Sequence, residues 1–339
     1  MTRVPENNPI MTTRDTLHRL RTSRRAPGAY LSRQWKSLQL AARAMRAPVA
    51  ALLVEVTPVA FAPTSLLATM APDAPGGETR AVAYGPNPRH RMDIYAPAPN
   101  TTPAPASASP SAPPFAPVVV FFYGGGWRSG DRAMYRFVGR TLAACGVLAV
   151  IPDYRVWPEV GFPDFLEDAA AAVAQARRIA PSMGGDPARL FLMGHSAGAY
   201  IAAMLALDPT WLAREGMNAR TALAGVVGIA GPYDFLPLRD PVLRQIFAGD
   251  DPRTQPISFA GNAAAPLLLL TGAADTTVEP ANSLRLADRV RAAGGAARTI
   301  VYPGLSHVSV LGAMSGPLHF LGSVRDDTCR FLVGQDPAT

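Results

Sequence analysis

The sequence is poor in the residues that build metal sites and disulfide frameworks. It has two cysteines, Cys145 and Cys329, and five histidines in 339 residues. Two cysteines cannot form a disulfide framework, and no C-x-x-C pair is present. No group of histidines, cysteines and carboxylates has metal-ligand spacing, so we expect no metal. A single bridge and two buried thiols both stay open for the cysteine pair, and so does the redox compartment.

The chain also lacks a long uninterrupted apolar run. The apolar stretch at residues 48–61 is too short to span a bilayer, and Glu55 and Pro58 interrupt it. A secretory signal has a short basic start followed by a clean apolar region, whereas the basic region here is unusually long. Cytoplasmic and exported locations therefore both stay open.

The excess of basic residues is confined to the N-terminal end. The whole chain has a formal net charge of +7, whereas residues 1–46 hold ten Arg or Lys and only two acids. Because that segment alone carries +8, the remaining residues 47–339 carry −1. A neutral body argues against nucleic-acid binding.

We expect two parts, a basic arm at residues 1–78 and a globular domain at residues 79–335. In the arm, apolar residues recur at helical spacing between Tyr30 and Met45, with basic residues on the other faces. Three interpretations stay open: a degenerate export signal, a helix in peripheral contact with a membrane surface, and helices packed beside a functional site.

The globular domain alternates between strand-like and helix-like segments. An initial pair of strands, residues 79–84 and 90–95, flanks a Gly-Pro-Asn-Pro turn, which predicts an antiparallel start. Residues 96–117, almost wholly Ala, Pro, Ser and Thr, read as a surface loop. Beyond it we expect strands at 117–123, 147–151, 190–193, 223–230, 266–271 and 297–302, and helices at 134–145, 165–179, 197–207, 280–293 and 317–333.

This alternation predicts an α/β fold, with a mostly parallel central sheet and helices on both faces. In such sheets, ligands bind outside the carboxyl ends of the strands. Functional residues should therefore be sought directly after each strand.

One strand runs straight into a helix through Gly194-His195-Ser196-Ala197-Gly198. A strand that turns into a helix over one residue forces that residue into a strained backbone conformation. Small residues two positions to either side let the turn close, and the serine oxygen is then exposed at the end of the strand. We expect Ser196 to be a nucleophile.

A second strand ends in Gly124-Gly125-Gly126. Three glycines in a row cost chain entropy, so something must require them, and a bare tight turn is one possible reason. Backbone N–H groups stabilise the oxyanion of an acyl transfer, and side chains would obstruct the approach. A phosphate cradle of the G-x-G-x-x-G type is the rival interpretation, but Ser129 occupies the place of its third glycine.

Asp275 and His307 each follow a late strand, and they suit a proton relay to Ser196. A serine hydroxyl is a poor nucleophile at neutral pH, so His307 would take its proton and return it to the leaving group. Asp275 would hold the imidazole tautomer and balance its positive charge. Asp234 is the reserve candidate for the acid.

Taken with these residues, the motifs resemble the carboxylesterases of the α/β-hydrolase superfamily, in the branch of hormone-sensitive lipase-like and bacterial feruloyl- or methylesterase-like enzymes. The order serine, acid, histidine is typical of that superfamily. The similarity covers roughly residues 79–332. It is carried by Tyr123-Gly-Gly-Gly-Trp127, Ser129-Gly-Asp131, Pro152-Asp-Tyr-Arg155, Pro158, Phe162-Pro163, Glu167-Asp168, Gly185-Asp-Pro187 and Gly194-His-Ser-Ala-Gly198.

The resemblance implies an α/β-hydrolase fold and a serine hydrolase without a cofactor. It also implies an oxyanion hole formed by the amides of Gly125, Gly126 and Ala197. Many relatives carry histidine where Tyr123 stands, and this departure concerns the geometry of the loop, whereas the mechanism is unaffected.

We therefore expect an esterase that cleaves small or medium acyl esters through an acyl-enzyme intermediate. Trp127, Phe162 and Tyr200 are candidates for an apolar acyl pocket, with core packing as the alternative. An amidase, formamidase or peptidase could use the same triad, because the fold does not choose the leaving group. A non-catalytic ligand-binding or membrane-surface protein also stays open, and so does the oligomeric state.

Overall fold

A computed structural model describes residues 74–98 and 115–335. By its internal contacts the chain divides into two units, residues 1–60 and 61–339, and every described residue belongs to the second. The predicted arm therefore lies, up to residue 73, outside the described residues, as does most of the predicted surface loop. No helix within 74–98 and 115–335 is long and apolar enough to cross a bilayer.

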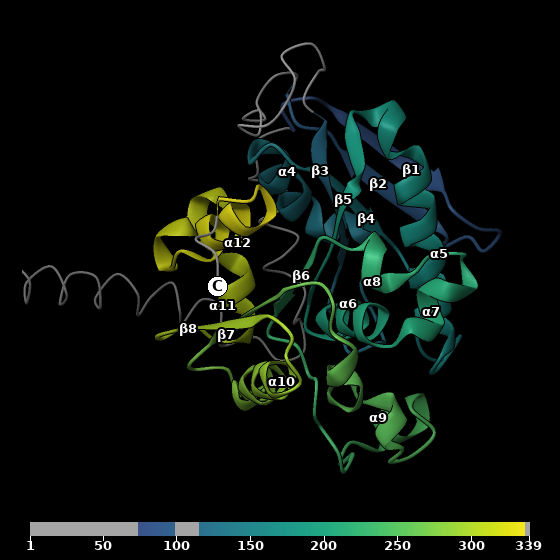
Figure 1. The fold of residues 1–339 in the computed structure, drawn as a ribbon, viewed down its shortest axis with the longest axis vertical. Helices are drawn as coiled ribbons and strands as arrows, with labels where there is room; N and C mark the ends of the chain where they lie inside the picture. Colours follow the sequence, from purple (N-terminus) through teal and green to yellow (C-terminus); the bar gives the residue numbers. More distant parts are fainter. Residues whose placement is uncertain (1–73, 99–114, 336–339) are drawn as a thin grey trace, which may run out of the picture. The chain divides into compact units, whose positions relative to one another are not determined.

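One eight-stranded sheet organises the described residues (Figure 1). Its spatial order is β1-β2-β4-β3-β5-β6-β7-β8. The β1–β2 and β2–β4 pairs are antiparallel and all the others are parallel. The predicted fold class is thus confirmed, including its antiparallel start. The strands are β1 (Glu78–Ala83), β2 (Arg91–Tyr95), β3 (Ala116–Phe122), β4 (Leu148–Pro152), β5 (Gly185–His195), β6 (Gly225–Ile229), β7 (Leu267–Gly272) and β8 (Ala297–Tyr302).

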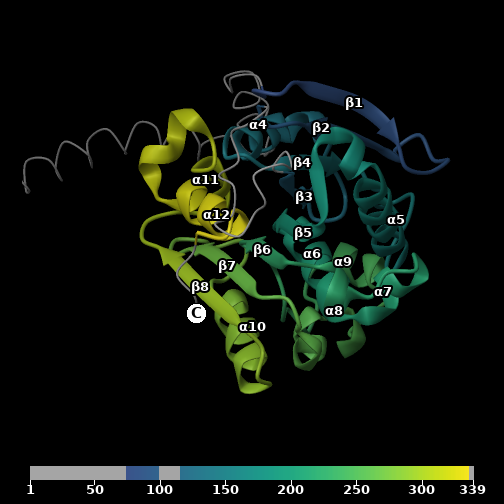
Figure 2. The same ribbon diagram turned by 45° about the horizontal axis from the view of Figure 1, so that its top comes forward.

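Helices cover both faces of this sheet. In Figures 1 and 2, α4, α11 and α12 gather on one face, and α5, α6 and α10 cover the other. The α-helices are α4 (Arg136–Ala144), α5 (Asp164–Ile179), α6 (Ala197–Leu207), α7 (Pro209–Arg214), α8 (Ala219–Ala222), α9 (Pro241–Ile246), α10 (Ala281–Ala292), α11 (His307–Gly312) and α12 (Val324–Leu332). Short 3₁₀ helices are η1 (Arg132–Tyr135), η2 (Ala180–Met183), η3 (Pro252–Thr254), η4 (Pro256–Asn262) and η5 (Gly316–Leu321).

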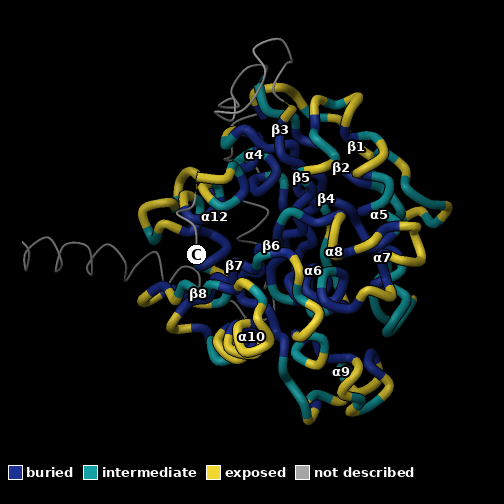
Figure 3. Tube along the Cα trace, in the orientation of Figure 1, coloured by how far each residue is buried: buried dark blue, intermediate teal, exposed yellow. Residues whose placement is uncertain are grey.

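The core lies along the central strands, which are buried on both faces (Figure 3). Every residue of β3, β4, β6 and β7 is buried. Helices on both faces exclude water from such strands, and this explains why they read as continuous apolar runs. The edge strands β1 and β8 keep exposed or half-buried residues. The sequence pattern therefore distinguishes interior strands from edge strands.

The sequence interpretation missed several short helices between β5 and β7. Helices α7, α9 and η3 each begin at a proline that follows an aspartate: Asp208, Asp240 and Asp251 accept a hydrogen bond from the backbone N–H two residues on. Aspartate at the N-cap and proline at the first helical position form a known start signal. These Asp-Pro pairs are the signal that could have revealed the three helices.

The predicted closing helix at 317–333 is wrong in its extent. Two helices, η5 and α12, occupy that segment, and the break between them falls at Gly322, which has an extended backbone. A further helix, α11, begins at His307 in a segment where we expected none. The break escapes the periodicity of apolar residues because such residues stand on both sides of Gly322, among them Leu321 and Val324.

Cys145 and Cys329 form a disulfide that ties α4 to α12, with a Cα–Cα distance of 5.9 Å. The Thr141 hydroxyl of α4 also donates to the Met314 carbonyl between α11 and η5, at 3.0 Å. The C-terminal helices are thus joined to the helix that follows the glycine loop. The bridge settles the choice that the sequence alone leaves open.

Replacing both cysteines by serine is expected to lower the free energy of unfolding by about 2–4 kcal/mol, because the unfolded chain regains the freedom that the bridge removes. Urea titration of the parent and of the double variant measures the difference. Reduced parent protein should match the double variant, and each single variant should match it too. Equal midpoints with and without reductant would contradict the prediction.

Candidate active site

Ser196 stands at the turn between β5 and α6, and its backbone is strained. Its φ is 54° and its ψ is −123°, a region that side-chain-bearing residues rarely adopt. A Cβ on Gly198 would lie 2.0 Å from the Phe122 carbonyl oxygen, and one on Gly194 would lie 2.2 Å from the backbone of Gly198. The steric requirement expected from the sequence is therefore present on both sides of Ser196.

Strand register brings the glycine loop to this turn. Phe122 of β3 pairs with Gly194 of β5, so the residues two places further on, Gly124 and Ser196, come side by side. A Cβ added to Gly124 would approach the Ser196 Cβ to 3.0 Å. A side chain at this position would require Ser196 or His195 to shift by a few tenths of an ångström.

Ser196, His307 and Asp275 form one hydrogen-bonded chain. The Ser196 Oγ lies 2.9 Å from His307 Nε2, and His307 Nδ1 lies 2.8 Å from Asp275 Oδ2. The register of the late strands explains this arrangement, because Gly272 of β7 pairs with Tyr302 of β8 and each residue follows its strand closely. The structure thus brings the three predicted residues together.

Asp275 is buried and held in a fixed orientation. Its side chain is fully buried, and its Oδ1 accepts hydrogen bonds from the backbone N–H groups of Thr277 and Val278, both at 2.9 Å. Burial raises the pKa of Asp275, but the hydrogen bond to His307 and the two amides outweigh it and hold the pKa below its usual range. The carboxylate therefore stays ionised at neutral pH.

The reserve candidate, Asp234, lies in another set of contacts. Its Oδ2 accepts a hydrogen bond from Arg285 Nε at 2.6 Å, and its backbone N–H donates to Asn282. Since Asp275 already contacts His307, Asp234 has no place in the chain of hydrogen bonds to Ser196.

His307 is the first residue of α11, and the start of this helix is fixed locally. The Ser306 side chain accepts from the Ser309 backbone N–H, and the Ser309 side chain accepts from the Ser306 backbone N–H. This reciprocal pair is a capping box with serine in both places. It orients the helix at the residue that carries the imidazole.

Two tyrosine hydroxyls hold the carbonyls of the glycine loop. Tyr154 donates to the Tyr123 carbonyl at 2.8 Å, and Tyr135 donates to the Gly124 carbonyl at 3.4 Å. The next two residues, Gly125 and Gly126, have φ values of 138° and 61°. Such values favour glycine, which explains why glycines stand at these two positions of the loop.

Tyr123, the residue noted above as a departure from the family that the sequence resembles, is the centre of a buried polar network. Its hydroxyl donates to Asp153 Oδ1 at 2.9 Å and accepts from Arg89 Nη2 at 3.0 Å. The Arg132 backbone N–H also donates to Asp153 Oδ1, at 2.7 Å. Burial raises the pKa of the Tyr123 hydroxyl well above its ordinary value, so it remains a donor. The tyrosine thus anchors the start of the glycine loop.

Tyr123→Phe is expected to lower the free energy of unfolding by about 1–3 kcal/mol, because it leaves Asp153 and Arg89 short of a partner. Chemical denaturation measures the change. Tyr95→Phe is a matched control, since the Tyr95 hydroxyl is buried and has no hydrogen-bond partner among the described residues. Equal losses in the two variants would contradict the assigned role of the network.

The three candidate pocket residues belong to a cluster of aromatic side chains. Trp127 and Tyr200 are 4% and 0% exposed and pack edge to face, with ring centroids 5.2 Å apart. The Tyr200 hydroxyl donates to the Thr254 carbonyl at 2.7 Å. Phe162 is half-buried and packs against Phe165 at 6.2 Å. Packing therefore accounts for the burial of Trp127 and Tyr200, and Phe162 is the most accessible of the three.

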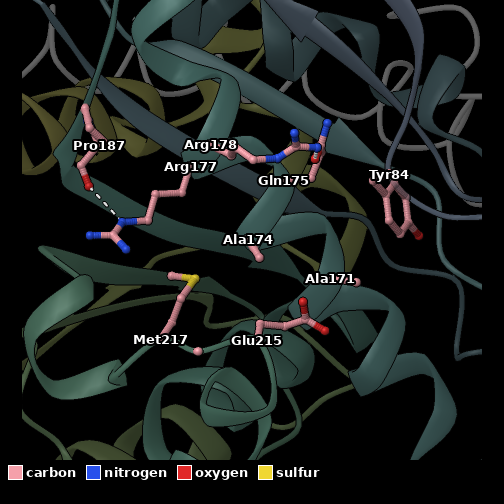
Figure 4. Close-up of a pocket in the computed structure, with 10 residues that line it drawn as sticks. Tyr84, Ala171, Ala174, Gln175, Arg177, Arg178, Pro187, Glu215 and Met217 are labelled. Carbon is pink, nitrogen blue, oxygen red and sulfur yellow. Dashed lines mark hydrogen bonds between the residues drawn. The ribbon is translucent and has the colours of Figure 1, made fainter.

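A separate surface pocket of about 540 Å³ lies beside α5 and contains none of the predicted site residues (Figure 4). It is lined by Tyr84, Ala171, Ala174, Gln175, Arg177, Arg178, Pro187, Glu215, Gly216 and Met217. Figure 4 shows Arg177 donating to the Pro187 carbonyl, at 3.5 Å. Among residues 74–98 and 115–335, no group of three or more His, Cys, Asp or Glu side chains could hold a metal ion.

Comparison with known families identifies the family to which the chain belongs. Residues 119–311, more than half of the sequence, match the family described as the alpha/beta hydrolase fold. The chain belongs to this family, and the resemblance seen in the sequence is confirmed.

Curated relatives in this family are named as esterases. An isoprenylcysteine alpha-carbonyl methylesterase of Arabidopsis thaliana is 26% identical over 253 residues, 68% of this chain and 56% of the relative. A probable isoprenylcysteine alpha-carbonyl methylesterase of Oryza sativa subsp. japonica is 31% identical over 254 residues, 68% and 57% of the two chains. Esterase LipC of Mycobacterium tuberculosis is 30% identical over 260 residues, 70% and 62% of the two. The chain thus spans little more than half the length of these relatives.

Solved structures share the fold at lower identity. A truncated carbohydrate esterase from gut microbiota has a TM-score of 0.64 and 21% identity, over 78% of this chain and 98% of that one. The apo form of Thermogutta terrifontis esterase 2 has a TM-score of 0.61 and 24% identity, over 78% and 97%. Identities in this range support the architecture alone.

Proposed function

We propose that the protein is a serine esterase that cleaves small or medium acyl esters through an acyl-enzyme intermediate. The observation that carries the proposal is the unbroken chain of hydrogen bonds from Ser196 Oγ through His307 to Asp275, at 2.9 Å and 2.8 Å. The names of the curated relatives support the same class of reaction.

In the first half of the reaction, His307 Nε2 takes the proton of Ser196 as Oγ attacks the ester carbonyl. The ionised Asp275 balances the positive charge that forms on the imidazole. The amides of Gly125, Gly126 and Ala197 stabilise the negative charge on the carbonyl oxygen. His307 then gives the proton to the leaving alkoxide, and the acyl group stays on Ser196.

In the second half, water replaces the alcohol. His307 takes a proton from the water as its oxygen attacks the acyl carbonyl, and it returns a proton to Ser196 Oγ as the bond to the serine breaks. The acid leaves and the hydroxyl is restored. No metal or cofactor takes part in either half.

The aromatic cluster suits an apolar acyl group. We assign Trp127 and Tyr200 to the packed base of the acyl site and Phe162, the half-buried member, to its wall. A shorter side chain at Phe162 enlarges the space, so Phe162→Ala should shift the preference toward longer acyl chains by about one to two methylene groups, with each methylene worth roughly 0.8 kcal/mol when buried.

A panel of matched esters and amides tests the proposal. It contains p-nitrophenyl acetate and butyrate, methyl esters chosen after the methylesterases among the relatives, and the corresponding anilides. We expect a burst of p-nitrophenol, the mark of an accumulating acyl-enzyme, and turnover of esters well above that of amides. Faster cleavage of amides would assign the protein to the amidases, and no turnover of any member would overturn the proposal.

A further inference from the structure

His195, the residue directly before the nucleophile, contacts the catalytic histidine. Its Nε2 lies 3.0 Å from the backbone carbonyl oxygen of His307, across 112 residues of sequence. The two imidazole rings lie 4.8 Å apart between centroids. Two consecutive residues thus contact His307: Ser196 contacts the His307 ring, and His195 contacts the His307 main chain.

The contact with a carbonyl fixes the tautomer of His195. A carbonyl oxygen can only accept, so His195 Nε2 carries the hydrogen and Nδ1 carries the lone pair. Burial, with a smaller contribution from the neighbouring His307, lowers the pKa of His195 to about 3, although the hydrogen bond to the His307 carbonyl and the charge of Asp275 act in the opposite direction. The ring is therefore neutral wherever a serine hydrolase is active.

The other ring nitrogen faces the glycine loop. Nδ1 is buried and has no hydrogen-bond partner among the described residues. A Cβ on Gly124 would lie 3.0 Å from it. The imidazole thus fills the space between the glycine loop on one side and the start of α11 on the other, and it is 6% exposed.

Packing alone does not account for a histidine at this place. An apolar side chain of the same size would fill the space without burying an unpaired acceptor, which is an unfavourable arrangement. What the histidine adds is one donated hydrogen bond, and that bond ends on the residue that carries the catalytic imidazole.

We propose that His195 is a positioning residue of the esterase, whose neutral Nε2–H holds the His307 main chain so that the His307 ring reaches both Ser196 Oγ and Asp275 Oδ2. This inference rests on the proposed function. Without the bond, the first residue of α11 has one restraint fewer, and the imidazole spends less time in line with the serine. Misplacement of a catalytic group by about 1 Å can cost about a hundredfold in rate.

Two substitutions of equal length separate the hydrogen bond from packing. In His195→Gln the amide nitrogen lies as many bonds from Cα as Nε2 does, so it can donate to the same carbonyl. In His195→Met a methyl group takes that place. We expect kcat on p-nitrophenyl acetate to fall by about 10- to 100-fold in the methionine variant and by about threefold or less in the glutamine variant, with KM nearly unchanged in both.

A spectroscopic signal reports the geometry directly. The proton shared by His307 Nδ1 and Asp275 gives a far-downfield resonance in a proton NMR spectrum. This signal should persist in the parent and in His195→Gln, and should broaden or vanish in His195→Met. In a third variant, His195→Asn, the amide reaches only as far as Nδ1, so it cannot donate to the His307 carbonyl. This variant should therefore show the same loss of kcat and of the downfield signal that we expect for His195→Met. It keeps the test available if the methionine variant folds poorly. Thermal unfolding identifies any variant that has lost its fold.

The outcomes distinguish the two proposals. If the parent neither turns over esters nor reacts with a fluorophosphonate probe, the proposed function fails, and this inference fails with it. If the parent is active and the folded glutamine, methionine and asparagine variants match it in kcat and in the downfield resonance, the positioning role alone is overturned. A low kcat shared by all three variants would also overturn it, because the donated bond would then not be what matters.

Discussion

Ser196→Ala is expected to lower kcat on p-nitrophenyl acetate by about a millionfold, and His307→Ala by a similar factor, because the members of such a triad act as a unit. Without Oγ no acyl-enzyme can form, and without the imidazole the base that lies 2.9 Å from Oγ is lost. His195 cannot substitute, since its Nε2 already faces the His307 carbonyl. The double variant should be no slower than either single variant.

Covalent labelling with a fluorophosphonate provides a second measurement of the same prediction. Intact mass should show one adduct on the parent and none on Ser196→Ala. Ser258→Ala is a control, because Ser258 is exposed and its hydroxyl donates to the Pro252 carbonyl, and this variant should label like the parent. A fully labelled Ser196→Ala would remove the serine from the mechanism.

Asp275→Asn is expected to lower kcat by about ten-thousandfold, because the imidazole would be held in the wrong tautomer. The backbone N–H groups of Thr277 and Val278 both donate to Oδ1. In the asparagine variant they fix the amide oxygen at that position, so the amide NH₂ faces His307 Nδ1. Nδ1 must then accept and Nε2 must carry the hydrogen, which prevents it from taking the proton of Ser196.

Steady-state kinetics on one ester measures this loss, and the reserve carboxylate supplies the control. Asp234→Asn breaks the ion pair with Arg285, whose Nε lies 2.6 Å from Asp234, and leaves the contact between His307 and Asp275 intact. It should keep the parent rate. If Asp234→Asn were the slower of the two variants, the assignment of the acid would have to be exchanged.

The nucleophile turn and the late strand ends could be predicted from the sequence for local reasons. The strand, the glycines and the helix around Ser196 are contiguous, and the sterics of the turn dictate their spacing. Asp275 and His307 could be predicted because each stands just after the carboxyl end of a parallel strand, and these ends lie along one edge of the sheet. For the same reason the glycine loop after β3 had to lie near Ser196, and register places Gly124 beside it.

The remaining features depend on contacts between distant segments. His195 occupies the variable position of its pentapeptide, and only the fold reveals that it meets His307. The pairing of Cys145 with Cys329, 184 residues apart, has no local signal. Tyr123 could be noted as a departure, but its role depends on Arg89 and Asp153, which reach it from other strands and loops. Short helices such as α7 and α9 were missed although their Asp-Pro starts were visible.

The cysteine bridge also makes part of the polypeptide a covalent macrocycle. Ser196, Asp275 and His307 all lie between Cys145 and Cys329 on this macrocycle, whereas Gly125 and Gly126 lie outside it. A single proteolytic nick between the two cysteines therefore cannot release either fragment. Nicked protein should migrate as one band on a non-reducing gel and as two bands after reduction, with all three side chains of the proposed triad retained in one molecule until the thiols are freed.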